Sequence, residues 1–445
     1  MAKIQAPINC MNQELNRPEN SSRRSFIKTS SVAVAGGLLL PRLGVQSARA
    51  ENNETLKIGL IGCGGRGTGA AGQALNADKN VVLTAVADAF DDRLQIGLNS
   101  IRGERGDKVK VQPDHCFVGL DAYQKLLASD VDVVILATPP GFRPTHLKAA
   151  IEAGKHVFCE KPMAVDAPGV RTVLAAAEEA KKKQLALASG FCWRSHYPKR
   201  ETFSRVLGGS IGKIQTVYST YNTGPVKENT LQTPGWSDME KQMRNWYQFA
   251  WLSGDHIVEQ AVHSLDMMSW AMGDIPPVRA TAVGGRQVRT SWGHIYDHFA
   301  VTYEYENGAR GMHMCRQQSG CSNDYAVHMA GTKGNCTVDC TRGQHIITGE
   351  NAWRYASKEP VVDMYQVEHN ELFAAIRSGK LINHGSWMAQ STLIAIMGRM
   401  AAYTGQTITW EQAMNSLETL APEKISWDAP VTVPSVAMPG ATKFV

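Results

Sequence analysis

Two kinds of hydrophobic pattern divide the chain. Between residues 56 and 189, short apolar runs such as LKIGLI, NVVLTAVAD and DVDVVILATPP alternate with longer Ala-rich or amphipathic stretches such as THLKAAIEAG and DAPGVRTVLAAAEEAKKKQ. The short runs predict buried strands, and the longer stretches predict helices. Strands that alternate with helices indicate a doubly wound parallel sheet of the α/β class.

The pattern changes at about residue 200. Segments such as VRATAVGGRQV, DHFAVTYEYENGARGMHMCRQQ and DYAVHMAGTKGNCTVDC read as strands joined by glycine-containing turns, and YENGAR is typical of a hairpin. They predict a second domain on a large, mostly antiparallel sheet. Helices are predicted at 257–272, 367–378 and 386–404. We expect a leader at 1–50, domains at 51–195 and 196–425, and a Pro-rich tail at 426–445; the helix at 386–404 is a candidate to pack back on the first domain.

A candidate export signal occupies the first 50 residues. Arg23 and Arg24 precede a short apolar run at 32–40, and SARA at 47–50 supplies a small-residue cleavage site. The run is far shorter than the roughly 18 residues that span a bilayer. The pattern resembles a removable twin-arginine (Tat) signal, which carries proteins that have already folded, and it predicts a periplasmic or extracellular protein without a membrane anchor.

The leader also accounts for the positive charge. It carries seven Lys/Arg and two Asp/Glu of the chain's 46 and 41, so the remaining 395 residues carry 39 of each. This balance gives no indication of a nucleic-acid or membrane partner. The eight cysteines outside the leader lack zinc-ligand spacing, so we expect no metal site. Cys336 and Cys340 could pair, although folding in the reducing cytoplasm favours free thiols.

A glycine-rich loop follows the first strand. Gly62, Gly64 and Gly67 form a G-x-G-x-x-G pattern, and the next strand ends in Asp88, 21 residues after Gly67. In this layout the glycines permit a tight turn, close approach to a pyrophosphate and packing of helix on strand, while the acid bonds an adenine-ribose diol. The spacing predicts a dinucleotide site, and Asp88 favours NAD over NADP. Arg66 and Arg93 are the residues that could instead hold a 2′-phosphate.

A second group of polar residues lies on the predicted helix at 257–272. Glu259, His263 and Asp266 fall at helical spacing, so they would share one face. A solvated amphipathic face would produce the same spacing. The many apolar residues around them indicate a buried helix instead, on which ionisable groups need partners or a function.

Together, IGCGGRG, then ATPP followed by His146 and AGKHVFCEKP, and then HSLD resemble the Gfo/Idh/MocA family of NAD(P)-dependent oxidoreductases, and the likeness covers residues 56–410. The family has a Rossmann domain and an open-faced sheet domain that often makes oligomers. The resemblance implies that Lys161 of the EKP sequence reaches substrate and nicotinamide, that the Lys161–Pro162 bond is often cis, and that His263 is the family's histidine. The family's aspartate is replaced by Glu259.

The candidate site residues follow from these patterns and this resemblance. The catalytic candidates are Lys161, His263 and Glu259. Substrate-binding candidates are Arg194, Trp246 and Asp266. The cofactor-binding candidates are Gly62, Gly64, Gly65, Arg66, Gly67, Asp88, Thr138, Glu160, Lys161 and Pro162.

These residues lead to a mechanism for a sugar or cyclitol CH–OH group. His263, with an ordinary imidazole pKa of about 6.5, would take the hydroxyl proton, while Lys161 donates to the oxygen and Glu259 orients the imidazole or the substrate. A tightly bound NAD, loaded before export, would take the hydride. The exported subset of the family near glucose–fructose oxidoreductase and NAD-dependent glycosidases is the most similar. An NAD-dependent glycoside hydrolase that oxidises C3 transiently, and a non-enzymatic carbohydrate-binding protein, are the alternatives.

Overall fold

The computed structural model describes residues 54–226, 235–290, 292–357 and 359–445. The predicted leader at 1–50 lies outside the described residues. None of the helices in the described ranges combines the length and the apolar character that crossing a membrane requires. All eight cysteines in these ranges, Cys336 and Cys340 included, are free thiols.

The first sheet consists of six parallel strands in the order β3-β2-β1-β4-β5-β6. The chain runs outward from β1 to β3 and then returns to β4, so the strand order reverses between β1 and β4. The predicted doubly wound parallel sheet is confirmed. Its strands are β1 (Leu56–Ile61), β2 (Val81–Asp88), β3 (Cys116–Val118), β4 (Val133–Leu136), β5 (His156–Cys159) and β6 (Leu187–Ser189).

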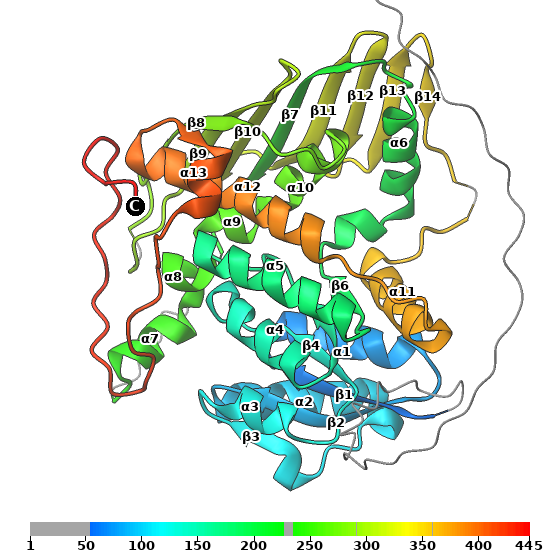
Figure 1. Cartoon of the computed structure of the whole chain (residues 1–445), viewed down its shortest axis with the longest axis vertical. Coiled ribbons are helices and arrows are strands. Elements are labelled where there is room, and N and C mark those ends of the chain that lie inside the picture. The colour runs from blue at the N-terminus through cyan, green and yellow to red at the C-terminus, as the bar shows by residue number, and fades with distance from the viewer. Residues whose placement is uncertain (1–53, 227–234, 291, 358) are drawn as a thin grey trace, which may run out of the picture. The chain divides into compact units, whose positions relative to one another are not determined.

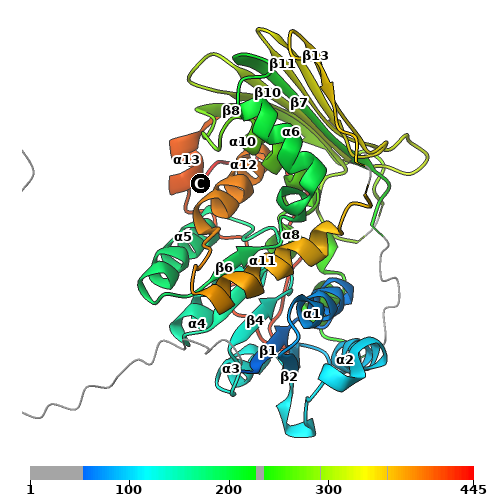
Figure 2. The same ribbon diagram turned by 90° about the vertical axis from the view of Figure 1, so that its right-hand side faces the viewer.

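Helices cover both faces of this sheet, which explains why its central strands are almost continuously apolar (Figure 2). One face packs against α1 (Gly65–Ala77), α2 (Asp91–Arg105) and α11 (Met364–Ser378). The other face packs against α3 (Ala122–Leu127), α4 (Arg143–Glu152) and α5 (Ala167–Lys182). Helix α11 comes from the last quarter of the chain, so the first domain is completed by a distant segment.

The second sheet has nine strands in the order β14-β13-β12-β11-β7-β10-β9-β8-β15. Its pairings are antiparallel except for β7 with β10, so the predicted mostly antiparallel sheet is confirmed. Its strands are β7 (Ile214–Thr223), β8 (Arg279–Gly285), β9 (His298–Glu304), β10 (Arg310–Gln317), β11 (Asp324–Gly331), β12 (Gly334–Asp339), β13 (Gln344–Gly349), β14 (Trp353–Arg354) and β15 (Ile408–Thr409).

Helices α6 (Tyr197–Leu207), α10 (Val262–Ala271) and α12 (Gly385–Thr404) lie on one side of this sheet (Figures 1 and 2). Strand β10 shows the consequence for its side chains. His313 and Cys315 are buried on the helix-covered face, while Met312 and Met314 on the alternate positions are exposed. A period of two is what a sheet covered on one face requires.

Helix α12 joins the two sheets. Its Thr392 hydroxyl accepts a hydrogen bond from the backbone N–H of Met163 in the first domain (3.2 Å), and its Ile394 carbonyl accepts one from the Tyr303 hydroxyl of β9 (2.9 Å). The late helix therefore packs on both domains.

The remaining segments surround these layers. Short helices are α7 (Asp238–Arg244), α8 (Ala250–Ser253), α9 (His256–Glu259) and α13 (Trp410–Asn415), with 3₁₀ turns at Gly106–Lys108, Pro113–His115, Pro140–Phe142, Cys192–Ser195 and Trp246–Gln248. The tail is held by contacts rather than by regular structure: the Val431 carbonyl accepts a hydrogen bond from Gln242, and the Ala437 carbonyl accepts one from Tyr296.

The predicted continuous helix at 257–272 is wrong in one respect. Helix α9 ends at Glu259 and α10 begins at Val262, with a wide turn between them. In this turn the Ala261 N–H bonds the His256 carbonyl, five residues back, at 3.0 Å. A five-residue step inserts one extra residue into the helical path, so Glu259 and His263 do not keep the simple i, i+4 relation.

Candidate active site

A cavity of about 580 Å³ lies at the carboxyl ends of the first sheet, where the strand order reverses between β1 and β4. Residues from both domains line it. In doubly wound sheets this switch point is where ligands bind, because the loops after neighbouring strands diverge there and leave a crevice. The glycine loop, Asp88, Lys161, Glu259 and His263 all belong to the lining.

The glycines of the loop meet three different spatial requirements. Gly62 has a φ of +97°, and a Cβ there would lie 2.7 Å from the Ala137 carbonyl carbon of the neighbouring loop. A Cβ at Gly67 would lie 1.9 Å from the Gly62 carbonyl oxygen, so the first turn of α1 packs directly on the end of β1. A Cβ at Gly64 or Gly65 would meet no atom within 4 Å, since both residues border the cavity.

Asp88 is held at the end of β2 by backbone groups. Its carboxylate accepts hydrogen bonds from the N–H groups of Cys63 (2.7 Å) and Phe90 (3.0 Å). Burial raises the pKa of Asp88, and these two hydrogen bonds oppose that rise. The first bond ties the acid to the glycine loop, so the two predicted cofactor elements form one surface.

This surface fits a dinucleotide. It offers open space over Gly64 and Gly65, the N-terminal turn of α1 with its N–H groups, and a carboxylate at the second strand. Thr138 lines the same cavity, and its hydroxyl lies 3.1 Å from Nδ1 of His146. Gly62 to Gly67, Asp88, Thr138 and Glu160 are therefore the residues that would hold NAD(P).

Arg66 has partners of its own. Its guanidinium bonds the buried carboxylate of Glu160, lies 3.7 Å from an oxygen of Glu368 in α11, and stacks on Tyr365 at 4.7 Å. The residue borders the cavity, yet its charge is directed to the Glu160 carboxylate and away from open space. Arg66 therefore connects the glycine loop to the EKP sequence and to the distant helix α11.

Lys161 follows β5 and contacts the second domain. Its ammonium donates to the Glu259 backbone carbonyl (2.6 Å) and lies 3.1 Å from the Glu259 carboxylate. The Lys161–Pro162 bond is cis, as the family resemblance implies. Two of the three ammonium protons are thus engaged, which leaves one for another acceptor.

His263 lies in an aromatic and cationic environment. Its ring stacks on Trp193 at 5.0 Å and meets Phe191 edge-on, and its Nδ1 is buried without a hydrogen-bond partner. Burial lowers the pKa of His263 well below its usual value, and the charges of Lys161 and Lys199 lower it further. The expectation of an ordinary imidazole pKa is wrong, and His263 is neutral at pH 7.

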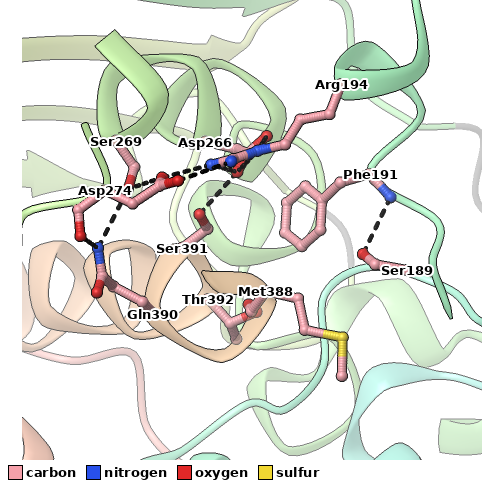
Figure 3. A network of polar contacts seen from close by, with 10 residues as sticks. All are labelled: Ser189, Phe191, Arg194, Asp266, Ser269, Asp274, Met388, Gln390, Ser391 and Thr392. Atoms are coloured by element: carbon pink, nitrogen blue, oxygen red, sulfur yellow. Dashed lines mark hydrogen bonds and ion pairs between the residues drawn. The ribbon is translucent and has the colours of Figure 1, made fainter. Parts of the chain in front are cut away.

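Two predicted substrate-binding residues lie elsewhere. Arg194 bonds both carboxylate oxygens of Asp266 (3.0 Å each) and pairs with Asp274, in a network that Ser391 of α12 completes (Figure 3). Neither Arg194 nor Asp266 borders the cavity. Asp266 is 0% exposed, so its charge is matched inside the protein and is not offered to a ligand.

Pro162 also lies outside the cavity lining, and its carbonyl accepts a hydrogen bond from Arg143 (2.6 Å). Trp246, the third predicted substrate residue, does border the cavity. The catalytic and binding roles of the lining residues remain predictions.

Several lining residues escaped the sequence reasoning. They are Tyr221 of β7, Gln260 in the turn after α9, His146 of α4, Arg244 of α7 and Tyr365 of α11. Gln260 adjoins Glu259 and could have been found from that position. His146 follows the ATPP sequence and could have been found from that motif. Tyr221, Arg244 and Tyr365 carry no local motif, because their elements reach the cavity only through tertiary packing.

Models of one protein family match most of the chain. The model described as "Oxidoreductase family, NAD-binding Rossmann fold" matches residues 56–188, and "Oxidoreductase family, C-terminal alpha/beta domain" matches residues 204–414. The chain belongs to the Gfo/Idh/MocA oxidoreductase family.

Individual relatives are distant. Inositol 2-dehydrogenase of Rhizobium meliloti (strain 1021) is 25% identical over 324 residues, which are 72% of this chain and 86% of the relative. Among solved structures, aldose-aldose oxidoreductase from Caulobacter crescentus, complexed with glycerol, superposes with a TM-score of 0.64 at 18% identity and covers 80% of this chain and 100% of its own. Levoglucosan dehydrogenase, in complex with NADH and levoglucosan, gives 0.62 at 18% identity, with 80% and 99% covered.

Proposed function

We propose that this oxidoreductase transfers a hydride between a nicotinamide cofactor and a CH–OH group of a sugar, glycoside or cyclitol. The observation that carries the proposal is the meeting of Lys161, Glu259 and His263 in the cavity that the glycine loop and Asp88 border. The similarity to an inositol 2-dehydrogenase and a levoglucosan dehydrogenase supports a polyol or sugar as substrate.

The protein's own residues manage the proton and the substrate oxygen. A bound nicotinamide supplies the hydride acceptor or donor. The neutral His263 imidazole accepts the hydroxyl proton as the C–H bond breaks, and the remaining Lys161 N–H bonds the same oxygen. Glu259 fixes the Lys161 ammonium through its carbonyl and its carboxylate, so its role is to position the lysine.

For the cofactor we propose NAD. The Asp88 carboxylate is fixed by two backbone N–H groups, so it stands ready for a ribose diol and repels a 2′-phosphate. Of the two arginines that the sequence singled out for that phosphate, Arg66 is engaged by Glu160 and lies beside Glu368, while Arg93 borders the cavity. Nucleotide extracted from the purified protein tests this choice: NADP in most molecules would contradict it.

The proposed reaction has two forms, which differ in net redox change. A dehydrogenase leaves an oxidised sugar, whereas a hydrolase that oxidises C3 transiently returns the hydride and releases an aglycone. We favour the dehydrogenase. The test incubates the protein, with its cofactor, with free sugars, cyclitols and aryl glycosides, and follows absorbance of reduced nicotinamide and release of the aryl alcohol. Reduction without release supports the dehydrogenase; release without net reduction supports the hydrolase; neither, with cofactor bound, contradicts both.

We also propose that the chain is exported through the Tat pathway with its cofactor bound and that it forms homo-oligomers through the second sheet. The paired Arg23 and Arg24 support export, and the exposed Met312 and Met314 of β10 support association. Replacement of both arginines by lysine should retain the protein in the cytoplasm. The molar mass of the purified protein in solution tests the association.

A further inference from the structure

A second pocket, of about 470 Å³, adjoins the active-site cavity. Tyr221 lines both, on β7. The second pocket is bordered by the segment that leads into α6, by β11 and β13, and by the start of α11. Neither the glycine loop nor Asp88 belongs to its lining.

Lys199 is the charged group of this pocket. Its side chain is on α6, and the residue is 4% exposed. No carboxylate among the described residues forms an ion pair with its ammonium; Asp363 lines the same pocket but is exposed and caps α11. A buried ammonium without a counter-ion is costly, so this arrangement calls for an anion from outside the chain.

Two histidines extend the donor set. Nδ1 of His196 lies 3.4 Å from the Lys199 ammonium and accepts a hydrogen bond from it. The neutral ring therefore carries its own hydrogen on Nε2. His345 lies beside it, with ring centres 5.8 Å apart. Burial and the Lys199 charge lower the pKa of His196 to about 4 and that of His345 to about 3, so Lys199 carries the one positive charge among these three basic groups.

The pocket is coupled to the reacting groups through Trp193. One contact of this indole is with the His263 ring at 5.0 Å, and another is with the Lys199 ammonium at 5.1 Å. Tyr221 and Tyr325 complete an aromatic wall, with ring centres 4.8 Å apart. Such walls suit the apolar face of a sugar ring, and the ammonium suits an acidic substituent on it.

We infer that the second pocket binds the anionic substituent of a sugar substrate, a carboxylate or a phosphate or sulfate ester, through Lys199 and His196. The inference rests on the proposed function for the placement of the reacting carbon near Lys161 and His263. The charge on Lys199 then selects acidic sugars over neutral ones.

The test measures binding and turnover separately. Isothermal titration calorimetry on the protein with its cofactor measures the affinity for three acidic sugars, one neutral sugar and two free ions. These are D-glucuronate, D-glucose 6-phosphate, D-glucose 6-sulfate, D-glucose, inorganic phosphate and inorganic sulfate. We expect at least one acidic sugar to bind about tenfold or more tightly than glucose. The uronate, the phosphate ester and the sulfate ester distinguish the sources of the anion. If both free ions bind as tightly as every acidic sugar, the site is a simple anion site and the inference is overturned.

Lys199→Met should remove this preference, and Lys199→Arg should retain part of it. Lys213→Met, an exposed lysine outside both pockets, is the matched control and should behave as the parent. Since Lys199 has no counter-ion, Lys199→Met should fold and melt at or above the parent temperature; a melting temperature well below the parent would assign Lys199 a structural role and overturn the inference. Equal binding of glucose and all acidic sugars would also overturn it.

Turnover separates this inference from the proposed function. Oxidation of neutral sugars as efficiently as acidic ones, with both rates unchanged in Lys199→Met, would leave the proposed function standing and overturn the inference. Lys199-dependent binding of acidic sugars without any nicotinamide reduction or aglycone release would support the pocket and contradict the proposed function.

Discussion

The two sides of the active-site cavity are built in different ways. Most of the cofactor side comes from one continuous segment, Gly62 to Asp88, to which Thr138 and Glu160 are added from later loops. It uses mainly backbone: open glycines, a helix N-terminus and a carboxylate held by two N–H groups. The substrate side brings Lys161, Tyr221, Glu259 and His263 from separate elements and uses side chains with mutual contacts. Cofactor binding therefore depends mainly on local chain geometry, whereas chemistry on the substrate depends on tertiary packing.

The largest effect should come from the substrate side. Lys161→Met and His263→Asn should each lower kcat by about 10²–10⁴, because each removes a group that bonds or deprotonates the reacting hydroxyl. Bound nucleotide should be retained, since the glycine loop is untouched. Steady-state kinetics and nucleotide content measure the two outcomes.

Lys148→Met, on the exposed surface of α4, serves as the lysine control and should turn over normally. Parent-like turnover in His263→Asn would remove the histidine from the reaction. Loss of nucleotide in either variant would contradict the separation of the two sides.

A stability effect of similar size should appear behind the substrate side. Asp266→Asn leaves the largely buried guanidinium of Arg194 with Asp274 as its remaining carboxylate, so the free energy of unfolding should fall by about 3 kcal/mol. Asp130→Asn removes the exposed partner of Lys57 and should cost at most about 1 kcal/mol. Urea unfolding measures both. If Asp266→Asn lowers the free energy of unfolding only slightly but raises KM strongly, Asp266 would belong to the substrate site after all.

On the cofactor side, neighbouring glycines should respond differently. Gly64→Val places its side chain in the open space of the cavity and should weaken nucleotide binding by roughly 10- to 100-fold, with little change in the stability of the nucleotide-free protein. In Gly67→Val the new side chain would collide with the Gly62 carbonyl, so the free energy of unfolding of the nucleotide-free protein should fall. Calorimetric titration with NAD and thermal melts measure the difference. If Gly64→Val binds the nucleotide as tightly as the parent, the nucleotide does not lie over Gly64 and the proposed site is wrong.

The smallest expected effect is that of pH on kcat, which should hardly change between pH 7 and pH 5.5. Because the pKa of His263 lies well below its usual value, the imidazole remains a base when the pH falls from 7 to 5.5, and kcat should change less than twofold. For an imidazole with a pKa of 6.5, the fraction in the neutral, basic form would fall about tenfold over that range. A tenfold drop in kcat would therefore contradict the burial of His263 in the working enzyme.

The pH experiment needs a folding control. Ten of the thirteen histidines have lowered pKa values in the folded chain, mainly through burial. Below pH 6.5 the unfolded chain therefore binds more protons than the folded one, and these groups lower stability progressively as the pH falls toward their folded values. Melting temperatures must stay above the assay temperature throughout.

Much of the architecture was predictable from local pattern. Local pattern predicts the bounds of β1, the end of β2 at Asp88 and the change from parallel to antiparallel strands near residue 200, and the structure has all three. Local pattern also predicts the three glycine positions. Each of these follows from nearby residues: a continuous apolar run predicts a doubly covered strand, and a glycine at fixed spacing predicts a tight turn.

The errors lie where distant segments meet. Asp266 and Glu259 looked alike on a helix face, yet one is matched by Arg194 and the other fixes Lys161. The pKa of His263 could not be predicted either, because Trp193, Lys161 and Lys199 come from other elements. Local spacing cannot distinguish a charge that is matched inside the protein from one that faces a ligand.

By itself, the sequence determined the two sheets, the family and the dinucleotide cradle, because hydrophobic period and glycine spacing act within a few residues of each other. Only the tertiary structure decided that α11 completes the first domain, that Arg66 bonds Glu160 and lies beside Glu368, and that Lys199 is buried without a counter-ion. The physical reason is that burial and charge pairing depend on which distant groups share a volume, and short-range patterns do not contain that information.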